Sequence, residues 1–389
     1  MTVAVKGVLA YDRGIWYNES SIKIRQERMV YDMQLRENAK LDLVMPTSMG
    51  VRIMPADHQP AAVSNHYLMT ATSAESNAGS ISAALGMNVS VLTKFVKDSV
   101  IAEFIRRDLR ARNMKYEGPE VVQDGPWGFR HQFNIADTGY GARGAKVQND
   151  RAGEVGVTIK AEDFDLDRIF AEDGVKIVHT SGLFTAMSAD TADCALKIAR
   201  KAKETGAKVS FDMNYRASFW KGREKELRAT FSEIAANADI LMGNEEDFQL
   251  ALGIEGPEAG GKDLSGKIDR FKELISRVKE RYPNVSVFGT TLREVVSASE
   301  NLWGAILSVG DEWYVEEPRP IQVLDRIGGG DGFAGGLLYA ILKGLPQEDW
   351  IKMGWAGGAL TVTLLTDYAL PASEAELWNI WKGNARVVR

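Results

Sequence analysis

Short apolar runs alternate with longer helical patterns from residue 41 onward, and this alternation constrains the fold of the chain most strongly. Several runs have the length of a strand and no regular polar face, which is typical of strands buried on both sides. These runs are residues 89–95, 175–182, 207–214, 238–244 and 285–291. Helical patterns are predicted at residues 98–111, 188–205, 221–237, 245–253, 263–282, 331–343, 346–363 and 372–382. The alternation predicts an α/β fold in which helices cover both faces of a parallel sheet and ligands bind beyond the carboxyl ends of the strands.

Two segments interrupt this alternation. Residues 1–40 form an N-terminal extension of unknown role, and its part from residue 18 to 40 is polar, charged and helix-compatible, with no strand signal. Residues 125–156 are rich in glycine, aromatic residues and arginine, and they are too long for a simple connection. We interpret this second segment as a functional loop or a lid of short strands.

Composition limits the class of protein. The net charge is −6, which argues against a broad nucleic-acid-binding surface, and the basic run at residues 105–115 fits the solvated face of an amphipathic helix. Cys194 is the single cysteine, so an intrachain disulfide and cysteine-rich metal sites are excluded. No apolar run reaches membrane-spanning length, and the N-terminus lacks a signal-peptide pattern. We therefore expect a cytoplasmic protein whose partners include neither nucleic acid nor a membrane.

The segment DRIGGGDGFAGG, residues 325–336, places three glycines directly before an aspartate at the start of a long helical pattern. Its GDGFAG stretch (330–335) matches the dinucleotide-binding pattern G-x-G-x-x-G, but no strand with an acidic end follows. A second glycine-rich segment, GPEAGGKD (256–263), lacks the Ser or Thr of a P-loop and is interpreted as a loop. A third interpretation of residues 325–336 is an anion-binding turn at a helix N-terminus, with Asp331 as a general base.

The anion-binding interpretation has a physical basis. The first N–H groups of a helix have no intrahelical partner, and glycines at 328–330 allow a phosphate to approach them. Such groups stabilise the charge of a transferring phosphoryl group, while Asp331 is placed to accept the proton of the attacking hydroxyl. The structural alternative is that Asp331 is an N-cap and the glycines form only a tight turn. Gly332, Gly335 and Gly336 add more glycine than such a turn requires.

The same segment resembles the C-terminal signature of the ribokinase-like (PfkB) carbohydrate kinases. FDMNYRASFW (211–220) resembles the strand and turn of the 2-keto-3-deoxygluconate kinases within that family, and MGNEEDFQLALGI (242–254) resembles the family's Asn-x-x-Glu region. AESNAGSISAALG (74–86) is similar to the sugar-site helix, NDRAGEVG (149–156) to a lid segment, and TTLREVVSAS (290–299) to the nucleotide-site strand and loop.

The resemblance extends from about residue 41 to the C-terminus, and it implies a ribokinase-like three-layer αβα sandwich with a mostly parallel central sheet and a small β lid. Residues 41–389 would form the kinase domain, with lid segments near 55–72 and 118–156, while residues 1–40 remain outside it. The resemblance also implies ATP and Mg²⁺ as cofactors. It leaves open a monovalent cation and a homodimer formed through the lid.

The resemblance further implies roles for individual residues, and a guanidinium at Arg216 suits the carboxylate of a sugar acid. The roles are Asp331 as catalytic base, the amides of Gly328, Gly329 and Gly330 as anion hole, Ser48, Ser73, Asn77, Arg151 and Arg216 as substrate contacts, Asn244, Thr290 and Arg293 as nucleotide contacts, and Asn244 and Asp247 as residues near Mg²⁺, in part through water.

Several of these residues have a structural alternative. Arg216 would instead cap the preceding strand, and Asn77 would cap the helix that follows it. Arg151 would belong to a surface ion pair. The acidic stretch from Asn244 to Asp247 would be an ordinary helix start.

The sequence departs from the family pattern mainly on the sugar side. Thr72 and Ser73 stand where paired glycines are usual, Asp247 stands in place of a glutamate, and Arg326 in place of a small residue. The phosphate-side glycines and Asp331 are intact, so the sequence predicts that phosphoryl transfer is retained while the sugar stays open.

The sequence therefore predicts an ATP-dependent kinase that phosphorylates a terminal hydroxyl of 2-keto-3-deoxygluconate or a similar sugar acid. Two alternatives remain: a kinase for another sugar such as fructose, and a non-catalytic relative that binds a sugar or a protein.

Overall fold

The computed structural model describes residues 8–12, 15–18, 33–256 and 264–385. The chain divides into two compact units, Met1–Gln34 and Leu35–Arg389. In the first unit, strands β1 (Val8–Asp12) and β2 (Ile15–Asn18) pair antiparallel.

Two segments discussed from the sequence fall partly outside the described ranges. Of the helix-compatible segment 18–40, residues 19–32 lie outside them, and residues 33–40 form no helix. In the glycine-rich segment 256–263, residues 257–263 lie outside them as well.

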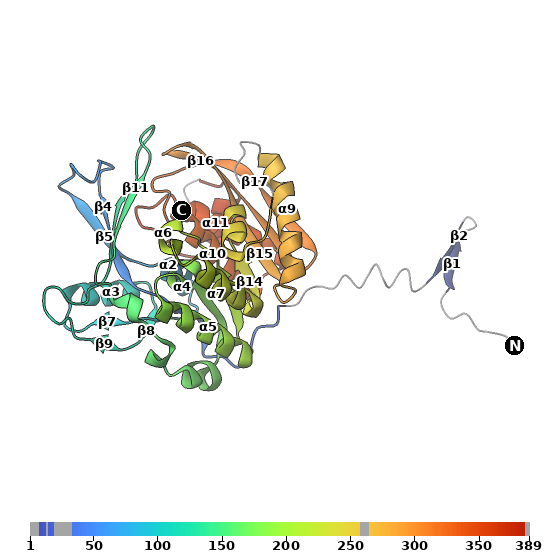
Figure 1. Ribbon diagram of the computed structural model, residues 1–389. Helices are drawn as coiled ribbons and strands as arrows, with labels where there is room; N and C mark the ends of the chain where they lie inside the picture. Colours follow the sequence, from blue (N-terminus) through green and yellow to red (C-terminus); the bar gives the residue numbers. More distant parts are fainter. Residues whose placement is uncertain (1–7, 13–14, 19–32, 257–263, 386–389) are drawn as a thin grey trace. The chain divides into compact units, whose positions relative to one another are not determined.

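A nine-stranded sheet forms the centre of the second unit (Figure 1). In spatial order its strands are β17 (Glu312–Gln322), β16 (Glu300–Val309), β15 (Val287–Ser297), β14 (Ile240–Met242), β13 (Lys208–Asp212), β12 (Val175–Ser181), β3 (Leu41–Pro46), β6 (Val89–Leu92) and β8 (Lys115–Glu117). Neighbouring strands from β15 to β8 are parallel, whereas β15, β16 and β17 pair antiparallel. The mostly parallel sheet is confirmed.

Helices pack in two layers against this sheet (Figure 1). One layer consists of α2 (Ala74–Ala84), α10 (Gly329–Lys343), α11 (Gln347–Thr361) and α12 (Glu374–Trp381). The other consists of α4 (Gly182–Thr185), α5 (Ala189–Glu204), α7 (Glu224–Asn237), α8 (Glu245–Leu252) and α9 (Leu264–Arg281). The three-layer αβα sandwich is confirmed. Every helix of the described residues is too short or too polar to span a bilayer.

The remaining elements lie at the edges of the sandwich. Helix α3 (Val100–Ala111) packs against β8 and against two strands outside the central sheet, β4 (Gly50–Pro55) and β5 (Tyr67–Thr72). Helix α6 (Ala217–Trp220) lies in the loop after β13. Three short helical segments precede β12: η1 (Val155–Thr158), η2 (Ala161–Asp163) and η3 (Asp167–Gly174). All eight helical patterns predicted from the sequence correspond to helices of the structure, with ends shifted by up to three residues.

A separate four-stranded sheet, which we call the lid sheet, stands beside the sandwich (Figure 1). Its strands, in spatial order, are β11 (Lys146–Asp150), β10 (Phe133–Asp137), β4 (Gly50–Pro55) and β5 (Tyr67–Thr72). A two-stranded ladder, β7 (Phe95–Val96) with β9 (Glu120–Val121), lies at its base. The long segment rich in glycine and aromatic residues therefore belongs to a small β lid, as predicted.

A buried ion pair joins the lid sheet to the turn that precedes α10. Arg52 of β4 donates from Nη2 to Oδ2 of Asp325, and both side chains are at most 1% exposed. The other carboxylate oxygen of Asp325 accepts a hydrogen bond from the backbone N–H of Ile327 at 3.0 Å. Burial raises the pKa of Asp325, and the charge of Arg52 opposes that rise. The pair thus holds the backbone entering α10 in place from the direction of the lid sheet.

Replacement of one partner leaves the other as an uncompensated buried charge, which destabilises a protein strongly. We expect Asp325→Asn to lower the free energy of unfolding in urea by about 3 to 5 kcal/mol. The matched control is Glu233→Gln, which breaks an exposed pair with Arg200 and should cost less than about 1 kcal/mol. Equal losses in the two variants would contradict the importance of the buried pair.

Candidate active site

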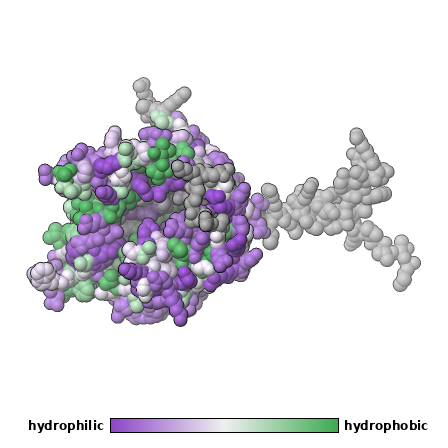
Figure 2. Space-filling model, turned by 45° about the horizontal axis from the view of Figure 1, so that its top comes forward, coloured by the Kyte–Doolittle hydropathy of each residue, from purple (hydrophilic) through white to green (hydrophobic). Residues whose placement is uncertain are grey.

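A pocket of about 850 Å³ opens at the carboxyl ends of the parallel strands, between the sandwich and the lid sheet. The loops after β13 and β14, strand β15, the start of α10 and the inner side of the lid sheet all contribute to its wall. The space-filling view shows a hollow in this face of the molecule, with polar and apolar side chains around it (Figure 2). This is the position that the strand order of an open α/β sheet favours for a ligand.

The turn at the floor of this pocket is built by glycine. Gly328 is the N-cap of α10 and has a φ of +87°, and a Cβ at this position would lie 2.1 Å from the carbonyl oxygen of Asp367. Gly330 differs, because a Cβ there would meet nothing within 4 Å. The first helical hydrogen bond runs from the N–H of Gly332 to the carbonyl of Gly328, so the N–H groups of residues 329–331 have no intrahelical partner. The N-cap interpretation of Asp331 is therefore wrong.

The later glycines of the motif have a structural reason. A Cβ at Gly332 would lie 2.3 Å from Thr361 Oγ1 in α11, and one at Gly336 would lie 2.1 Å from a carbonyl of α11. A Cβ at Gly335 would lie 2.5 Å from the carbonyl of Ala78 in α2. These glycines allow α10 to approach both neighbouring helices closely, so they are no evidence for phosphate binding.

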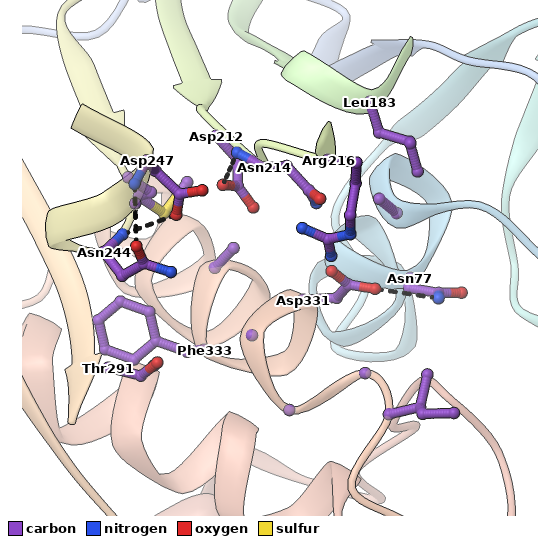
Figure 3. A pocket seen from close by; sticks show the side chains of 18 of the residues that line it. Asn77, Leu183, Asp212, Asn214, Arg216, Asn244, Asp247, Thr291, Asp331 and Phe333 are labelled. Atoms are coloured by element: carbon purple, nitrogen blue, oxygen red, sulfur yellow. Dashed lines mark hydrogen bonds between the residues drawn. The ribbon is translucent and has the colours of Figure 1, made fainter. Parts of the chain in front are cut away.

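Asp331 lies in the first turn of α10 and contacts α2. Asn77 donates from Nδ2 to Oδ2 of Asp331 at 3.1 Å (Figure 3). Burial raises the pKa of Asp331 well above its usual value, the hydrogen bond from Asn77 opposes this rise, and the carboxyls of Asp212, Asp367 and Glu75 add to it. A carboxyl with a raised pKa is a stronger base than an exposed one.

The N-terminus of α2 corrects a second expectation. Its N-cap is Ser73, whose Oγ accepts a hydrogen bond from the N–H of Ser76 at 3.1 Å. The capping alternative for Asn77 is therefore wrong.

Two arginines line the pocket near the lid sheet. Arg216 follows β13, makes no capping hydrogen bond with its side chain, and points toward Asp331 and Asn77 (Figure 3). Its side chain forms a local hydrogen bond, from Nη1 to the carbonyl of Tyr215 at 2.8 Å. Arg151 comes from the end of the lid sheet and forms an ion pair with the buried Glu154 at 2.8 Å, while its Nε has no hydrogen-bond partner among the described residues. Arg151 thus belongs to an ion pair and also lines the pocket.

Two carboxylates stand at the ends of β13 and β14. Asp247 accepts hydrogen bonds from the backbone N–H groups of Tyr215 and Asn244 at 2.9 and 2.8 Å, and Asn244 Oδ1 accepts from the N–H of Asp247 at 2.9 Å. The acidic stretch is therefore a capped helix start, and it also lines the pocket. Burial, together with the charge of Asp247, raises the pKa of Asp212 to about 7.

These carboxylates suit Mg²⁺ better than a metal that needs a full protein cage. Among the described residues, no group of three or more His, Cys, Asp and Glu side chains is arranged to hold a metal ion. Mg²⁺ usually keeps several waters and takes one or two carboxylates together with substrate phosphates. Asp212 and Asp247, which both line the pocket, fit that donor set.

The far end of the pocket carries two arginines that have no protein partner. Thr290 and Arg293 of β15 line it together with Arg326, which precedes the glycine turn. Within the described ranges, the side chains of Arg293 and Arg326 form no hydrogen bond and no ion pair. Burial and the charge of Arg326 both lower the pKa of Arg293. Two guanidinium groups without protein partners favour an anionic ligand at this end.

Two of the residues predicted from the sequence lie outside the pocket wall. Ser48 is buried and donates to Glu154 Oε1 at 2.6 Å, and Ser73 is occupied as the N-cap of α2. All the others line the pocket, namely Asn77, Arg151, Arg216, Asn244, Asp247, Thr290, Arg293, Gly328, Gly329, Gly330 and Asp331.

The structure adds residues that were not selected from the sequence. Asp212 and Asn214 line the pocket at the end of a predicted strand, a position that could have indicated them. Asn134 and Asn149 face the pocket from neighbouring strands of the lid sheet and are joined by a hydrogen bond of 3.0 Å. Asp367 lies in an irregular segment far along the chain from the glycine turn, and no motif marks it.

Comparisons with known proteins agree with this geometry. Residues 159–371 match the family model described as "pfkB family carbohydrate kinase". The chain is 24% identical to a 5-dehydro-2-deoxygluconokinase of Clostridium perfringens over 85% of this chain and 89% of that protein. It is 25% identical to a 2-dehydro-3-deoxygalactonokinase of Haloferax volcanii over 82% and 90% of the two chains. The crystal structure of a 2-dehydro-3-deoxygluconokinase from Thermotoga maritima superposes with a TM-score of 0.79, at 26% identity, over 88% of this chain and 98% of that one.

The two ends of the glycine turn should respond differently to a methyl group. We expect Gly328→Ala to lower the free energy of unfolding by at least about 2 kcal/mol, because alanine resists a positive φ and its Cβ would collide with Asp367. Gly330→Ala should leave this free energy unchanged or raise it by up to about 1 kcal/mol, since its Cβ meets only open space in a helix. Urea unfolding of both variants measures the difference. A destabilised Gly330→Ala variant would contradict the open geometry.

Proposed function

Because the chain belongs to the pfkB family of carbohydrate kinases, we propose that it uses ATP and Mg²⁺ to phosphorylate a terminal hydroxyl of 2-keto-3-deoxygluconate or a similar sugar acid. One observation carries this proposal. A carboxyl with a raised pKa, Asp331, and an unobstructed helix N-terminus at Gly330 share one turn at the floor of the pocket. The base would then act on the attacking hydroxyl, and the anion hole on the phosphoryl group that this hydroxyl attacks.

The proposed reaction is an in-line phosphoryl transfer. Asp331 takes the proton of the sugar hydroxyl, whose oxygen forms a bond to the γ-phosphorus while the bond between that phosphorus and the bridging oxygen to the β-phosphate breaks. ADP leaves with the electron pair of the broken bond. The N–H groups of residues 329–331 face the equatorial oxygens, where the negative charge of the transition state is spread.

The nucleotide would occupy the end of the pocket formed by β14, β15 and the glycine turn. Thr290 and Asn244 would contact it there, and Arg293 and Arg326 would pair with its phosphates. Mg²⁺, when bound near Asn244 and Asp247, supplies charge compensation for the phosphates. The hydrogen bonds that Asp247 accepts from two backbone N–H groups favour contact with the ion through water.

The sugar acid would occupy the end beneath the lid sheet. Arg216 and Arg151 both line this end, and a carboxylate suits the planar fork of a guanidinium group. The amides of Asn134, Asn149 and Asn214 can donate to hydroxyls and accept from them. The names of the similar proteins from C. perfringens, H. volcanii and T. maritima all refer to keto-deoxy sugar acids, which supports this choice.

Some wider expectations belong to the same proposal. Residues 41–389 would act as the catalytic domain in the cytoplasm, and the lid sheet would close over the sugar to exclude water. A homodimer through the lid sheet and a requirement for a monovalent cation are left to direct measurement of mass and of salt dependence.

Asp331→Asn tests the base. A positioned general base contributes a factor of about 100 to 10,000, so kcat should fall by that amount, while the Kd of ATP measured by calorimetry should change little. The assay couples ADP release to a spectroscopic signal with Mg-ATP and a panel of 2-keto-3-deoxygluconate, its galactonate epimer, gluconate, fructose and ribose. Normal turnover in the variant would reject Asp331 as base. Activity on fructose alone would indicate that the substrate is a neutral sugar. No activity of the wild type on any compound of the panel would favour a non-catalytic relative.

Arg216→Ala tests the carboxylate. Loss of a charge-assisted hydrogen bond costs about 1.5 to 3 kcal/mol, so kcat/KM for the acid substrates should fall about 10- to 100-fold more than for neutral sugars. Lys221→Ala, which removes an exposed charge outside the pocket, is the matched control. Equal losses on acids and neutral sugars would remove the carboxylate argument.

A further inference from the structure

Arg112 is a fully buried arginine that the proposed reaction does not use. It is the C-cap of α3 and is 1% exposed. Its Nε donates to Asp108 Oδ1 at 2.6 Å, its Nη2 donates to the carbonyl of Ala71, and its guanidinium carbon lies 3.3 Å from the centroid of the Tyr368 ring. Three separate contacts therefore fix the guanidinium group in one orientation.

The remaining nitrogen of this guanidinium faces the helix that contacts Asp331. Arg112 Nη1 lies 3.4 Å from Asn77 Oδ1 and 3.5 Å from Ser80 Oγ, both in α2. The same Asn77 side chain donates from Nδ2 to Asp331 at 3.1 Å. Arg112, Asn77 and Asp331 thus form a continuous chain of hydrogen bonds from α3 through α2 to α10.

The chemistry of these groups permits only one orientation of the amide. An arginine has only donors, and an ionised carboxylate has only acceptors. The amide oxygen of Asn77 must therefore face Arg112, and its NH₂ group must face Asp331. In the reversed orientation the NH₂ group would meet the donors of Arg112, and the oxygen would meet the carboxylate.

We propose that Arg112 is a positioning residue that holds the Asn77 amide with its NH₂ group toward Asp331. The inference deepens the proposed function, because it assumes that Asp331 acts as the base. Its consequence is electrostatic: a donor fixed toward Asp331 favours the ionised form that the base requires.

The charges around Asp331 make this donor important. The carboxyls of Asp212 at the end of β13, Asp367 after α11 and Glu75 in α2 all raise the pKa of Asp331, as burial does. The guanidinium of Arg216 points toward Asp331 from the opposite wall of the pocket (Figure 3). The hydrogen bond from Asn77 is the largest influence that lowers this pKa.

The test is a double-mutant cycle read on the pH dependence of kcat/KM. Asp331 must be ionised to act as a base, so activity declines as the pH falls through its pKa. Removal of the hydrogen-bond donor to Asp331 raises that pKa, so the acidic limb of the pH profile of kcat/KM moves to higher pH. We expect Asn77→Ala to move the limb upward by about one pH unit, which corresponds to one hydrogen bond to a charged group. Arg112→Met should move it in the same direction.

The cycle separates positioning from general damage. In the Asn77→Ala background, Arg112→Met should cause no further shift, and above the limb Arg112→Met by itself should recover most of the wild-type rate. Ser80→Ala removes the other acceptor of Arg112 Nη1 without touching the amide, and it should leave the limb unchanged. An equal shift in both backgrounds, or no shift in Arg112→Met, would overturn the inference.

A second variant covers the outcome in which Arg112→Met fails to fold. Arg112→Lys keeps the charge beside Asp108, but one ammonium group cannot reach Asp108, the Ala71 carbonyl and Asn77 together. It should shift the limb upward, and an unshifted limb would count against the inference. If the proposed function is wrong, Asp331→Asn keeps its turnover. If only this inference is wrong, Asp331→Asn is inactive, and the pH shifts of Asn77→Ala and Arg112→Met add up in the double variant.

Discussion

Helix α10 approaches two other helices at backbone distance, and the site depends on that approach. Glycines at 332, 335 and 336 remove the side chains that would separate α10 from α11 and α2. Because the backbones come so close, Asp331 in the first turn of α10 reaches Asn77 in α2. A larger residue at any of the three positions would push the helices apart and would separate these two side chains. The tight packing of α10 is therefore also what brings Asp331 and Asn77 together.

The charges in the pocket are unbalanced without a ligand. Burial and carboxyls from three separate parts of the chain raise the pKa of Asp331, while the side chains of Arg293 and Arg326, among the described residues, have no protein partner. Like charges held at short distance disfavour the free protein. A polyphosphate at the arginines and a cation at the carboxylates would relieve both repulsions at once. This imbalance of charge supports the proposal that the pocket binds Mg-ATP.

Sequence patterns predicted the regular parts of the fold well, because buried strands and amphipathic helices leave a periodic signal. The parallel sheet and the helices follow from such signals, whereas the lid sheet was expected from a segment that interrupts them and from the family resemblance. Strands β16 and β17 were not predicted: β17 is half-exposed along most of its length, and its pattern lacks the continuous apolar run that marks a buried strand. The contributions of Arg52, Arg112 and Asp367 were also missed, because each acts on residues far away in the sequence and carries no local motif.

The same limit applies to the packing and capping roles of single residues near the site. Glycine at 332, 335 and 336 suggested phosphate binding, yet what these residues contact is decided by helix packing, which local sequence does not show. Ser73 was assigned to the substrate, and it caps α2. By contrast, Gly328, Gly330 and Asp331 act within one turn, so the sequence contained most of the information needed to place them.

The ion pair between Arg52 and Asp325 has a mechanical consequence for the lid sheet. It anchors β4 to the segment that leads into the glycine turn, while at the far end of the lid sheet two hydrogen bonds join Gly141, between β10 and β11, to Ala298 and Ser299 of the sandwich. The lid sheet is thus tied to the sandwich by a buried ion pair at one end and by two hydrogen bonds at the other. If the lid sheet moves over a bound sugar, the bonds of Gly141 must break, while the ion pair keeps the backbone before the glycine turn in place.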